Sequence, residues 1–237
     1  DNICDSRPDS FVVSPRGEMV LRHRLPGDEI RLPGGTKSVK KLFIDKKQNL
    51  SDVSIKLSKK SVGASLNVLF AGLSIEKFNV ENVLFEPEGL DVIKFLQNAG
   101  YNVSLDNTNL SYEKRSLDFK LVKHVVIPDR IEVMTFIVLG LLCGDLTIQN
   151  VDIEHLKEPI NLLKNSGYNI ILNRSMVKVL KSLGGPLFFE TDVYPGIPTD
   201  IQPILGVLAL FNLGTSNIVE NVFEKRFQIY EDMKIIG

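Results

Sequence analysis

One acidic residue, Asp200, lies in the segment YPGIPTDIQ (194–202), two positions after Pro198 and just ahead of a long apolar run. An oxygen at such a position can accept hydrogen bonds from the free backbone N–H groups at the start of a helix, and a carboxylate suits the positive end of the helix dipole. Thr199 or Asp200 is therefore a candidate helix N-cap. A proline-stiffened loop can also hold a carboxylate rigidly for chemistry, and the segment alone leaves both roles open.

A second group of residues with chemical potential is basic. Lys37, Lys40 and Lys41 follow the glycine pair at 34–35, and such a cluster suits a phosphate backbone through non-specific charge contacts. Residues 1–60 hold 13 Lys and Arg against 8 Asp and Glu, whereas the remainder holds 15 against 21. This asymmetry predicts two units with different partners, and the alternative is a merely solvated basic surface.

Cysteine usage and hydropathy exclude several classes of protein. The two cysteines are Cys4, near the chain start, and Cys143, inside an apolar stretch that we expect to be buried. They indicate no disulfide framework, and we expect no metal ion or cofactor. The longest uncharged apolar run, Val133–Cys143, is far shorter than the roughly twenty residues that span a bilayer. The first residues, DNICDSRPDS, lack a signal-peptide pattern, so we expect a cytoplasmic protein.

The elements that must position these residues form an internal repeat. Segments 61–100, 127–167 and 197–237 each contain an apolar helix, a small turn, a short strand and a two-faced helix that ends in Gly. The first helix of each segment is apolar nearly all round, so we expect it to be buried. The sequence predicts α/β units of the order α-β-α-β-β with mixed sheets. The landmark positions are Asn82, Asn150 and Asn221, and Gly100, Gly167 and Gly237.

Five ordered motifs carry a resemblance to an enzyme family. The motifs are SVGAS (61–65), EPE (86–88), IPDRIE (127–132), YPGIPTDIQ (194–202) and NVFEKRF (221–227). In this order and spacing they resemble UDP-N-acetylglucosamine 1-carboxyvinyltransferase, an enolpyruvyl transferase, over about residues 53–237. The resemblance implies a partial inverse α/β barrel, in which residues 53–125 end a first lobe and residues 126–237 begin a second.

The activity that the resemblance implies is transfer of enolpyruvyl from phosphoenolpyruvate to the 3-hydroxyl of UDP-N-acetylglucosamine, the first committed step of peptidoglycan synthesis. Asp200 would accept the proton of the sugar hydroxyl, which is a poor nucleophile without a base in hydrogen-bond reach. Arg226 would bind phosphoenolpyruvate, since a planar guanidinium suits a carboxylate. Lys225 departs from the Asn that is usual in the family. The residues expected to bind substrate are Lys59, Lys60, Ser61, Val62, Asp200 and Val222.

Each of these roles has a structural alternative. Ser61 could simply cap a helix, the side chain of Val222 could belong to the core, and Arg226 could be an ordinary surface arginine. Three residues of the IPDRIE motif would lie near the cleft, although an Arg–Glu pair on one helix turn could be purely structural. Those residues are Asp129, Arg130 and Glu132. If the assignment is right, Asp200 faces a groove shared with the Ser61 turn.

The resemblance also predicts a gap in the catalytic machinery. The family's proton-donating cysteine lies on a Gly-rich loop that has no counterpart here, and neither Cys4 nor Cys143 suits a reactive, partly exposed thiol. The Lys-Asn pair that holds phosphoenolpyruvate in the family has no counterpart either. We therefore expect this chain alone not to turn over.

Residues 1–50 carry a second resemblance. The stretch RHRLPGDEIRLPGGTKSVKKLFID is similar to the C-terminal domain of tRNA(Ile)-lysidine synthetase, which implies a small basic α+β fragment. Its lysines, Lys37, Lys40 and Lys41, would contact tRNA. An RNA-binding remnant is therefore the alternative function, with a join near residues 46–57.

Overall fold

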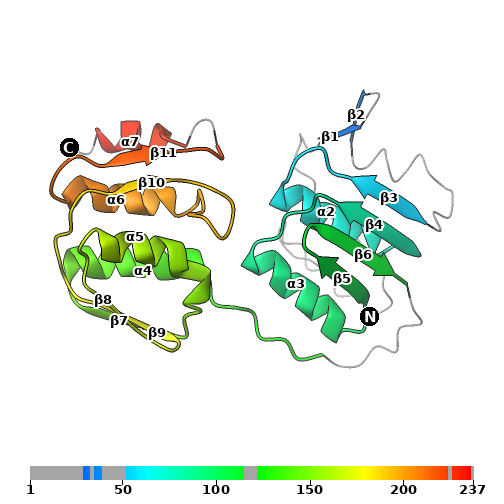
Figure 1. The fold of residues 1–237 in the computed structure, drawn as a ribbon, viewed down its shortest axis with the longest axis horizontal. Coiled ribbons are helices and arrows are strands. Elements are labelled where there is room, and N and C mark those ends of the chain that lie inside the picture. Colours follow the sequence, from blue (N-terminus) through cyan, green and yellow to red (C-terminus); the bar gives the residue numbers. More distant parts are fainter. Residues whose placement is uncertain (1–28, 33–34, 39–51, 115–121, 224–225, 236–237) are drawn as a thin grey trace, which may run out of the picture. The chain divides into compact units, whose positions relative to one another are not determined.

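The computed structural model describes residues 29–32, 35–38, 52–114, 122–223 and 226–235, and in the first two ranges the backbone alone. The described chain divides into two compact units (Figure 1). The first contains the residues up to Phe85 together with Val92–His124, and the second contains Glu86–Asp91 together with the residues from Val125 onward. Two short antiparallel strands, β1 (Glu29–Leu32) and β2 (Gly35–Ser38), precede the main sheet of the first unit.

The first unit is a four-stranded mixed sheet with two helices, as Figure 1 shows. The strand order is β3-β4-β6-β5, with β3 parallel to β4 and the other pairs antiparallel. Its core is formed by buried side chains such as Leu69, Phe78 and Leu110. The elements are β3 (Val53–Lys56), α2 (Val62–Gly72), β4 (Lys77–Glu81), α3 (Pro87–Asn98), β5 (Asn102–Asp106) and β6 (Asn109–Glu113).

The second unit begins with helix α4 and a three-stranded antiparallel sheet of order β7-β9-β8. Met134 and Ile137 of α4 are fully buried, and Gly140 lets the helix approach the sheet, because a Cβ there would lie 2.3 Å from a methyl group of Val179. The elements are α4 (Arg130–Cys143), β7 (Leu146–Gln149), η1 (Glu154–Leu156), α5 (Lys157–Asn165), β8 (Ile170–Asn173) and β9 (Met176–Val179).

The last part of the chain adds a parallel strand pair to the second unit, and α6 packs on α4. In Figure 1 the pair β10-β11 and the sheet β7-β9-β8 lie on opposite sides of α4 and α6. One apolar core joins these layers, with Ile201 and Leu205 fully buried in it. The elements are β10 (Phe188–Glu190), α6 (Gln202–Phe211), β11 (Asn217–Val219) and α7 (Gln228–Met233).

The mixed α/β fold is as predicted, and the element order α-β-α-β-β occurs once in each unit. The strand orders β4-β6-β5 and β7-β9-β8 correspond element by element. Asn82 and Asn150 follow the first strand of each set with φ of 64° and 58°, and Gly100 and Gly167 follow the second helix with φ of 93° and 87°. These positions take the left-handed conformation, which Gly and Asn adopt at the least cost. Gly237 lies outside the described residues.

Two expectations about burial are wrong. In α2 only Ser65, Leu69 and Gly72 are buried, because the described residues pack on one side of this helix alone. Cys143 is exposed, since it is the last residue of α4 and lies beyond the buried Leu141. Among the described residues no helix combines the length and the apolar character needed to cross a membrane.

Candidate functional site

The loop that carries Asp200 does not cap the helix that follows it. Helix α6 begins at Gln202, and no side chain accepts a hydrogen bond at its N-cap, Ile201. The loop closes through backbone bonds instead, from Ile201 N to Pro198 O at 2.9 Å and from Gln202 N to Thr199 O at 3.2 Å. The N-cap prediction for Thr199 or Asp200 is therefore wrong. Both side chains turn to partners outside the helix.

The partner of Asp200 is Arg226, whose Nη2 donates a hydrogen bond to Oδ1 of the carboxylate. The Asp200 side chain is 58% exposed and that of Arg226 is 31% exposed. The guanidinium also lies over the ring of Phe223, with 5.5 Å from Cζ to the ring centroid. Its Nε is buried and has no hydrogen-bond partner among the described residues, so the arginine keeps one donor for a further acceptor.

The partner of Thr199 is Glu220, which directly follows β11. Thr199 Oγ1 donates to Oε2 of Glu220 at 3.0 Å, and Oε1 accepts from the backbone N–H groups of Val222 at 2.8 Å and Phe223 at 2.9 Å. Burial alone would raise the pKa of Glu220, but these bonds and one from the Thr191 hydroxyl outweigh it and lower the pKa below its usual value. Glu220 is therefore held ionised between two loops.

A tyrosine from α7 lies against the first turn of α6. Tyr230 Oη accepts from Gln202 Nε2 at 2.7 Å and donates to the backbone oxygen of Gln202 at 3.3 Å. The ring approaches closely because residue 206 is glycine, since a Cβ on Gly206 would lie 1.8 Å from Tyr230 Oη. Burial, and next the negative charge of Glu220, raise the pKa of Tyr230 to about 12. The phenol is thus neutral under ordinary conditions.

The IPDRIE motif forms a separate cluster. Asp129 caps α4, with its Oδ1 accepting from the backbone N–H groups of Ile131 and Glu132. The Arg130 side chain is 3% exposed and binds Glu86 at 2.8 Å and Glu88 at 2.8 Å. Its partners are therefore the glutamates of the EPE motif and not Glu132, which is exposed in the first turn of α4. The expectation of an Arg–Glu pair within one helix turn is wrong.

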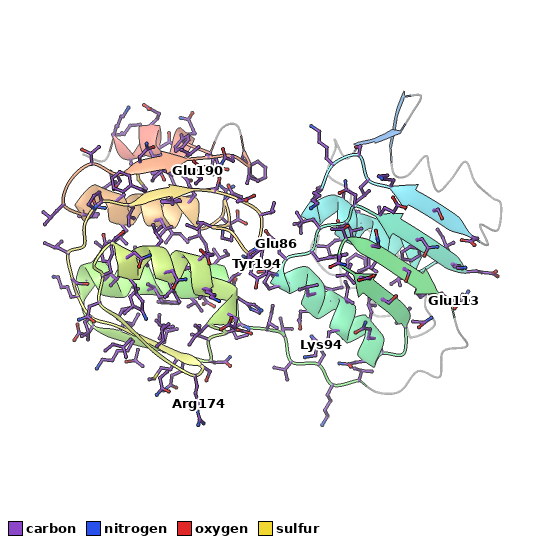
Figure 2. All side chains as sticks on the ribbon, viewed as in Figure 1. Glu86, Lys94, Glu113, Arg174, Glu190 and Tyr194 are labelled. Carbon is purple, nitrogen blue, oxygen red and sulfur yellow. The ribbon has the colours of Figure 1, made fainter. Side chains whose placement is uncertain are left out.

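The guanidinium of Arg130 also lies 5.6 Å from the ring centroid of Tyr194. Figure 2 labels this tyrosine and Glu86, and both contact Arg130. Glu86 precedes Arg130 in the sequence, and Tyr194 follows it. A buried arginine between two carboxylates and an aromatic ring is held by each of them. The cluster therefore fixes the start of α4 with a buried guanidinium, while the Glu88 side chain stays half exposed.

The residues expected to contact a nucleotide sugar lie mostly in the first unit, at the start of α2. Ser61 caps this helix, with Oγ accepting from Ala64 N at 3.3 Å. Lys59 and Lys60 are exposed just before it, and Val62 is half-buried. Val222, by contrast, belongs to the second unit and is 41% exposed, so its side chain is not a core residue. The start of α2 and the Asp200 loop belong to different units, and the groove expected between them remains a prediction.

Several expected residues cannot be placed. Cys4, Lys40, Lys41 and Lys225 lie outside the described residues, and for Lys37, in β2, only the backbone is described. The described part of the chain contains no cluster of three or more His, Cys, Asp or Glu side chains suited to a metal ion.

Sequence reasoning missed three residues whose hydrogen bonds involve the Thr199 side chain or the first turn of α6, next to Asp200. Glu220 stands one position before the NVFEKRF motif, and Gln202 is the last residue of YPGIPTDIQ. Tyr230 had no local signal of its own. The glycine at 206, inside an apolar helix, was the available sign that another group approaches there.

Comparison with known proteins was consistent across sequence and structure. A sequence model of the EPSP synthase (3-phosphoshikimate 1-carboxyvinyltransferase) family matches residues 29–237. The UDP-N-acetylglucosamine 1-carboxyvinyltransferase of Halothermothrix orenii is 34% identical over 218 residues, which cover 89% of this chain and 50% of that protein. UDP-N-acetylglucosamine 1-carboxyvinyltransferase 2 of Bacillus subtilis is 32% identical over 195 residues, covering 80% and 45%. This chain spans about half the length of the curated relatives it matches.

Solved structures share the fold. The enolpyruvyl transferase NikO from Streptomyces tendae matches with a TM-score of 0.71 at 22% identity, over 80% of this chain and 49% of that one. EPSP synthase from Acinetobacter baumannii matches with a TM-score of 0.57 at 19% identity, over 80% and 46%. At these identities the similarity concerns the fold alone.

These comparisons correct the sequence analysis at one end of the chain. The family match begins at residue 29, inside the segment that we related to tRNA(Ile)-lysidine synthetase, and nothing in the comparisons supports that second resemblance. The expected boundary near residue 53 remains a prediction. Because the match runs from residue 29 to residue 237, the chain belongs to the EPSP synthase family of enolpyruvyl transferases.

Proposed function

We propose that this chain forms part of an enzyme that transfers enolpyruvyl from phosphoenolpyruvate to the 3-hydroxyl of UDP-N-acetylglucosamine, in the cytoplasmic synthesis of peptidoglycan. The relatives that share about a third of its residues carry that activity in their names. The fold would be part of an inverse α/β barrel built from repeats, in line with the matching element orders of the two units.

The observation that carries the proposal is the contact between Asp200 and Arg226. In the reaction the sugar 3-oxygen bonds to C2 of phosphoenolpyruvate, its proton passes to a base, C3 gains and then loses a proton, and phosphate leaves C2. Asp200 is an exposed carboxylate that can orient the hydroxyl and take its proton. Arg226, whose side chain is 31% exposed, is suited to the negative charge of phosphoenolpyruvate beside it.

The nucleotide sugar would bind through the residues at the start of α2. Lys59 and Lys60 supply positive charge, and the backbone N–H groups after Ser61 can bind diphosphate oxygens. Val222 would meet the uridine part through its main chain. These assignments extend the family resemblance to exposed groups of this chain and await a binding experiment.

Titration of the purified chain with UDP-N-acetylglucosamine, followed by calorimetry, tests the proposal. We expect saturable binding that Ser61→Ala and Asp200→Asn each weaken by about tenfold or more, the loss expected for a charged or capping hydrogen bond at a binding site. Ser74→Ala, at the other end of α2, and Asp192→Asn, an exposed carboxylate in the loop before Asp200, are the matched controls. Absence of saturable binding by the unaltered chain would overturn the proposal.

Turnover is a separate matter. The two cysteines of the chain do not match the Gly-rich cysteine loop of the family, and Cys143, although exposed, ends helix α4. We therefore expect no phosphate release from this chain with both substrates present. Steady release in a coupled assay would show that another group supplies the proton to C3.

A further inference from the structure

We propose that Glu220 is a positioning residue, which holds Asp200 and Arg226 against each other by binding the loops that carry them. Its role in catalysis rests on the proposed function, whereas its role in the geometry does not. Glu220 is suited to this because its two carboxylate oxygens bind different segments. Oε2 receives the Thr199 hydroxyl, and Oε1 receives the backbone N–H groups of Val222 and Phe223.

These bonds close a ring of contacts. Thr199 is covalently joined to Asp200, and the segment that starts at Val222 and Phe223 leads to Arg226. These two segments meet again in the Asp200–Arg226 ion pair. Glu220 binds both segments at the opposite side of the ring from that ion pair.

The ring is anchored to the sheet by Thr191. This residue is fully buried after β10, and its Oγ1 accepts from the backbone N–H of Asn221 at 2.9 Å. The Asn221 side chain donates to the backbone oxygen of Thr191 at 3.2 Å and to the carboxylate of Glu190, labelled in Figure 2, also at 3.2 Å. Glu220 is therefore fixed in space by the strand pair and not only by the loops that it binds.

The chemistry of the ring requires a carboxylate. Every group that Glu220 binds is a donor: two backbone N–H groups and the hydroxyls of Thr199 and Thr191. A carboxylate only accepts, so it can satisfy all of them, whereas an amide of the same shape would turn an NH₂ group toward at least one of them. Glu220→Gln therefore tests charge and acceptor capacity with the size of the side chain unchanged.

An exposed ion pair needs such support. Pairs between exposed side chains gain little, because ordering two long side chains offsets most of the attraction. With its carboxylate 58% exposed, Asp200 would not keep Arg226 in one orientation without a second constraint on both loops. Glu220 supplies that constraint by binding Thr199, next to Asp200, and the backbone of Val222 and Phe223, ahead of Arg226.

The test is the NMR signature of the Arg226 guanidinium in the purified chain, assigned by its loss in Arg226→Lys. We expect slow guanidinium rotation and separate Nη resonances in the unaltered chain, and fast averaging in Asp200→Asn, which removes the ion pair. Glu220→Gln should give the same fast averaging, although Asp200 and Arg226 are both still present in this variant. Glu231→Gln, which removes an exposed α7 carboxylate whose hydrogen bonds among the described residues come from Lys234, should leave the signature unchanged.

Two further variants keep the test decisive if Glu220→Gln unfolds. Thr199→Val keeps the shape of the side chain and removes one hydrogen bond of the ring, the one from the Thr199 hydroxyl to Glu220. It should therefore speed guanidinium rotation in a folded protein. Glu220→Asp keeps the charge and should restore part of the slow rotation that Glu220→Gln loses. Slow rotation of Arg226 in folded Glu220→Gln or Thr199→Val would overturn the proposal.

The outcome separates this proposal from the proposed function. If the chain does not bind UDP-N-acetylglucosamine but the Arg226 signature depends on Glu220, the positioning role stands and the substrate assignment fails. If the chain binds the nucleotide sugar, Glu220→Gln should weaken binding by about as much as Asp200→Asn, roughly tenfold. Unchanged binding by Glu220→Gln, with Asp200→Asn impaired, would contradict a role for Glu220 at the site.

Discussion

At the scale of single residues, the site depends on which partner satisfies each polar group. Asp200 and Thr199 were credible helix caps, yet their hydrogen bonds go to Arg226 and Glu220, and α6 starts without a side-chain cap. Gln202 is fully buried and pairs through its amide with Tyr230. Polar groups that lose water must find partners, so the partners of these buried or half-buried side chains define the geometry around Asp200.

Tyr230 gives this geometry a pH dependence at the alkaline end. Its pKa is raised to about 12 by burial and by the charge of Glu220, so the folded state favours the neutral phenol. The stabilisation from this shift is complete below pH 10, near the ordinary pKa of a tyrosine, and is lost as the pH rises toward 12. We expect the free energy of unfolding to fall over that range in urea titrations.

The matched variant for this prediction is Tyr230→Phe. It should decline less between pH 10 and pH 12, and its ultraviolet absorbance titration should lack the latest phenolate step. An equal decline in Tyr230→Phe would assign the effect to the other tyrosines with raised pKa values, Tyr112 and Tyr168.

At the scale of elements, close approach between α6 and α7 is set by one glycine. A Cβ on Gly206 would lie 1.8 Å from Tyr230 Oη, so Gly206→Ala must push the tyrosine away. We expect a loss of about 1–3 kcal/mol in the free energy of unfolding, the usual range for overpacking. Near-ultraviolet circular dichroism during urea unfolding measures it.

The control is Gly63→Ala in α2, where a Cβ meets nothing within 4 Å. Alanine favours a helix over glycine by about 0.5–1 kcal/mol, so this variant should gain stability. Combining Gly206→Ala with Tyr230→Ala should remove most of the clash. If Gly206→Ala cost no more than Tyr230→Ala alone, the approach of the ring would not be the reason for the glycine.

The sequence predicted elements well where local chemistry decides them. Ser61 is the N-cap that the sequence allowed, with its partner in the first turn of α2, and Gly100 and Gly167 follow their helices in the left-handed conformation at the positions marked by the repeat. Prediction failed where distant residues decide. The cap assigned to the Asp200 loop and the partner of Arg130 depend on segments far along the chain, and no local pattern encodes them. The burial expected of Cys143 failed because this residue ends α4.

For the asparagines at the strand ends, the sequence predicted the positions but not the hydrogen bonds. Asn82 donates to the backbone oxygen of Leu57 at 2.8 Å, just after β3, and Asn221 donates to that of Thr191, just after β10. Each amide thus links a strand to its parallel neighbour. The sequence marked these positions by spacing alone, whereas their shared hydrogen bond became evident only in the structure.

At the scale of the whole molecule, the described chain consists of two units, and the Asp200–Arg226 pair lies in the second. All the residues that form the ring around Glu220 belong to that unit, as does the cluster around Arg130. Arg130 is the most deeply buried charged side chain among the described residues and has an Nη1 without a hydrogen-bond partner there. Its carboxylate partners precede α4 by more than forty positions, so it joins distant parts of the sequence.

We expect Arg130→Met to destabilise the second unit by about 1.5–3 kcal/mol, because it removes the charge-assisted hydrogen bonds to the carboxylates of Glu86 and Glu88. Hydrogen exchange of amides in α4 and β9 measures the loss within that unit. Arg174→Met, in the exposed β8–β9 turn that Figure 2 labels, is the control and should change exchange little. Equal protection in both variants would show that the buried pair contributes nothing net.

The parallel pairing of β10 with β11 extends over three residues, from Phe188 opposite Asn217 to Glu190 opposite Val219. Alternate residues of a strand face opposite sides, so a slip of one position would point Glu220 away from Thr199 and toward the other face. The alignment of this short ladder therefore sets whether the Asp200 carboxylate and the Arg226 guanidinium can meet at all. Insertions in the turn before β11 would be tolerated only when they leave that alignment intact, which makes strand register a determinant of the ion-pair geometry in its own right.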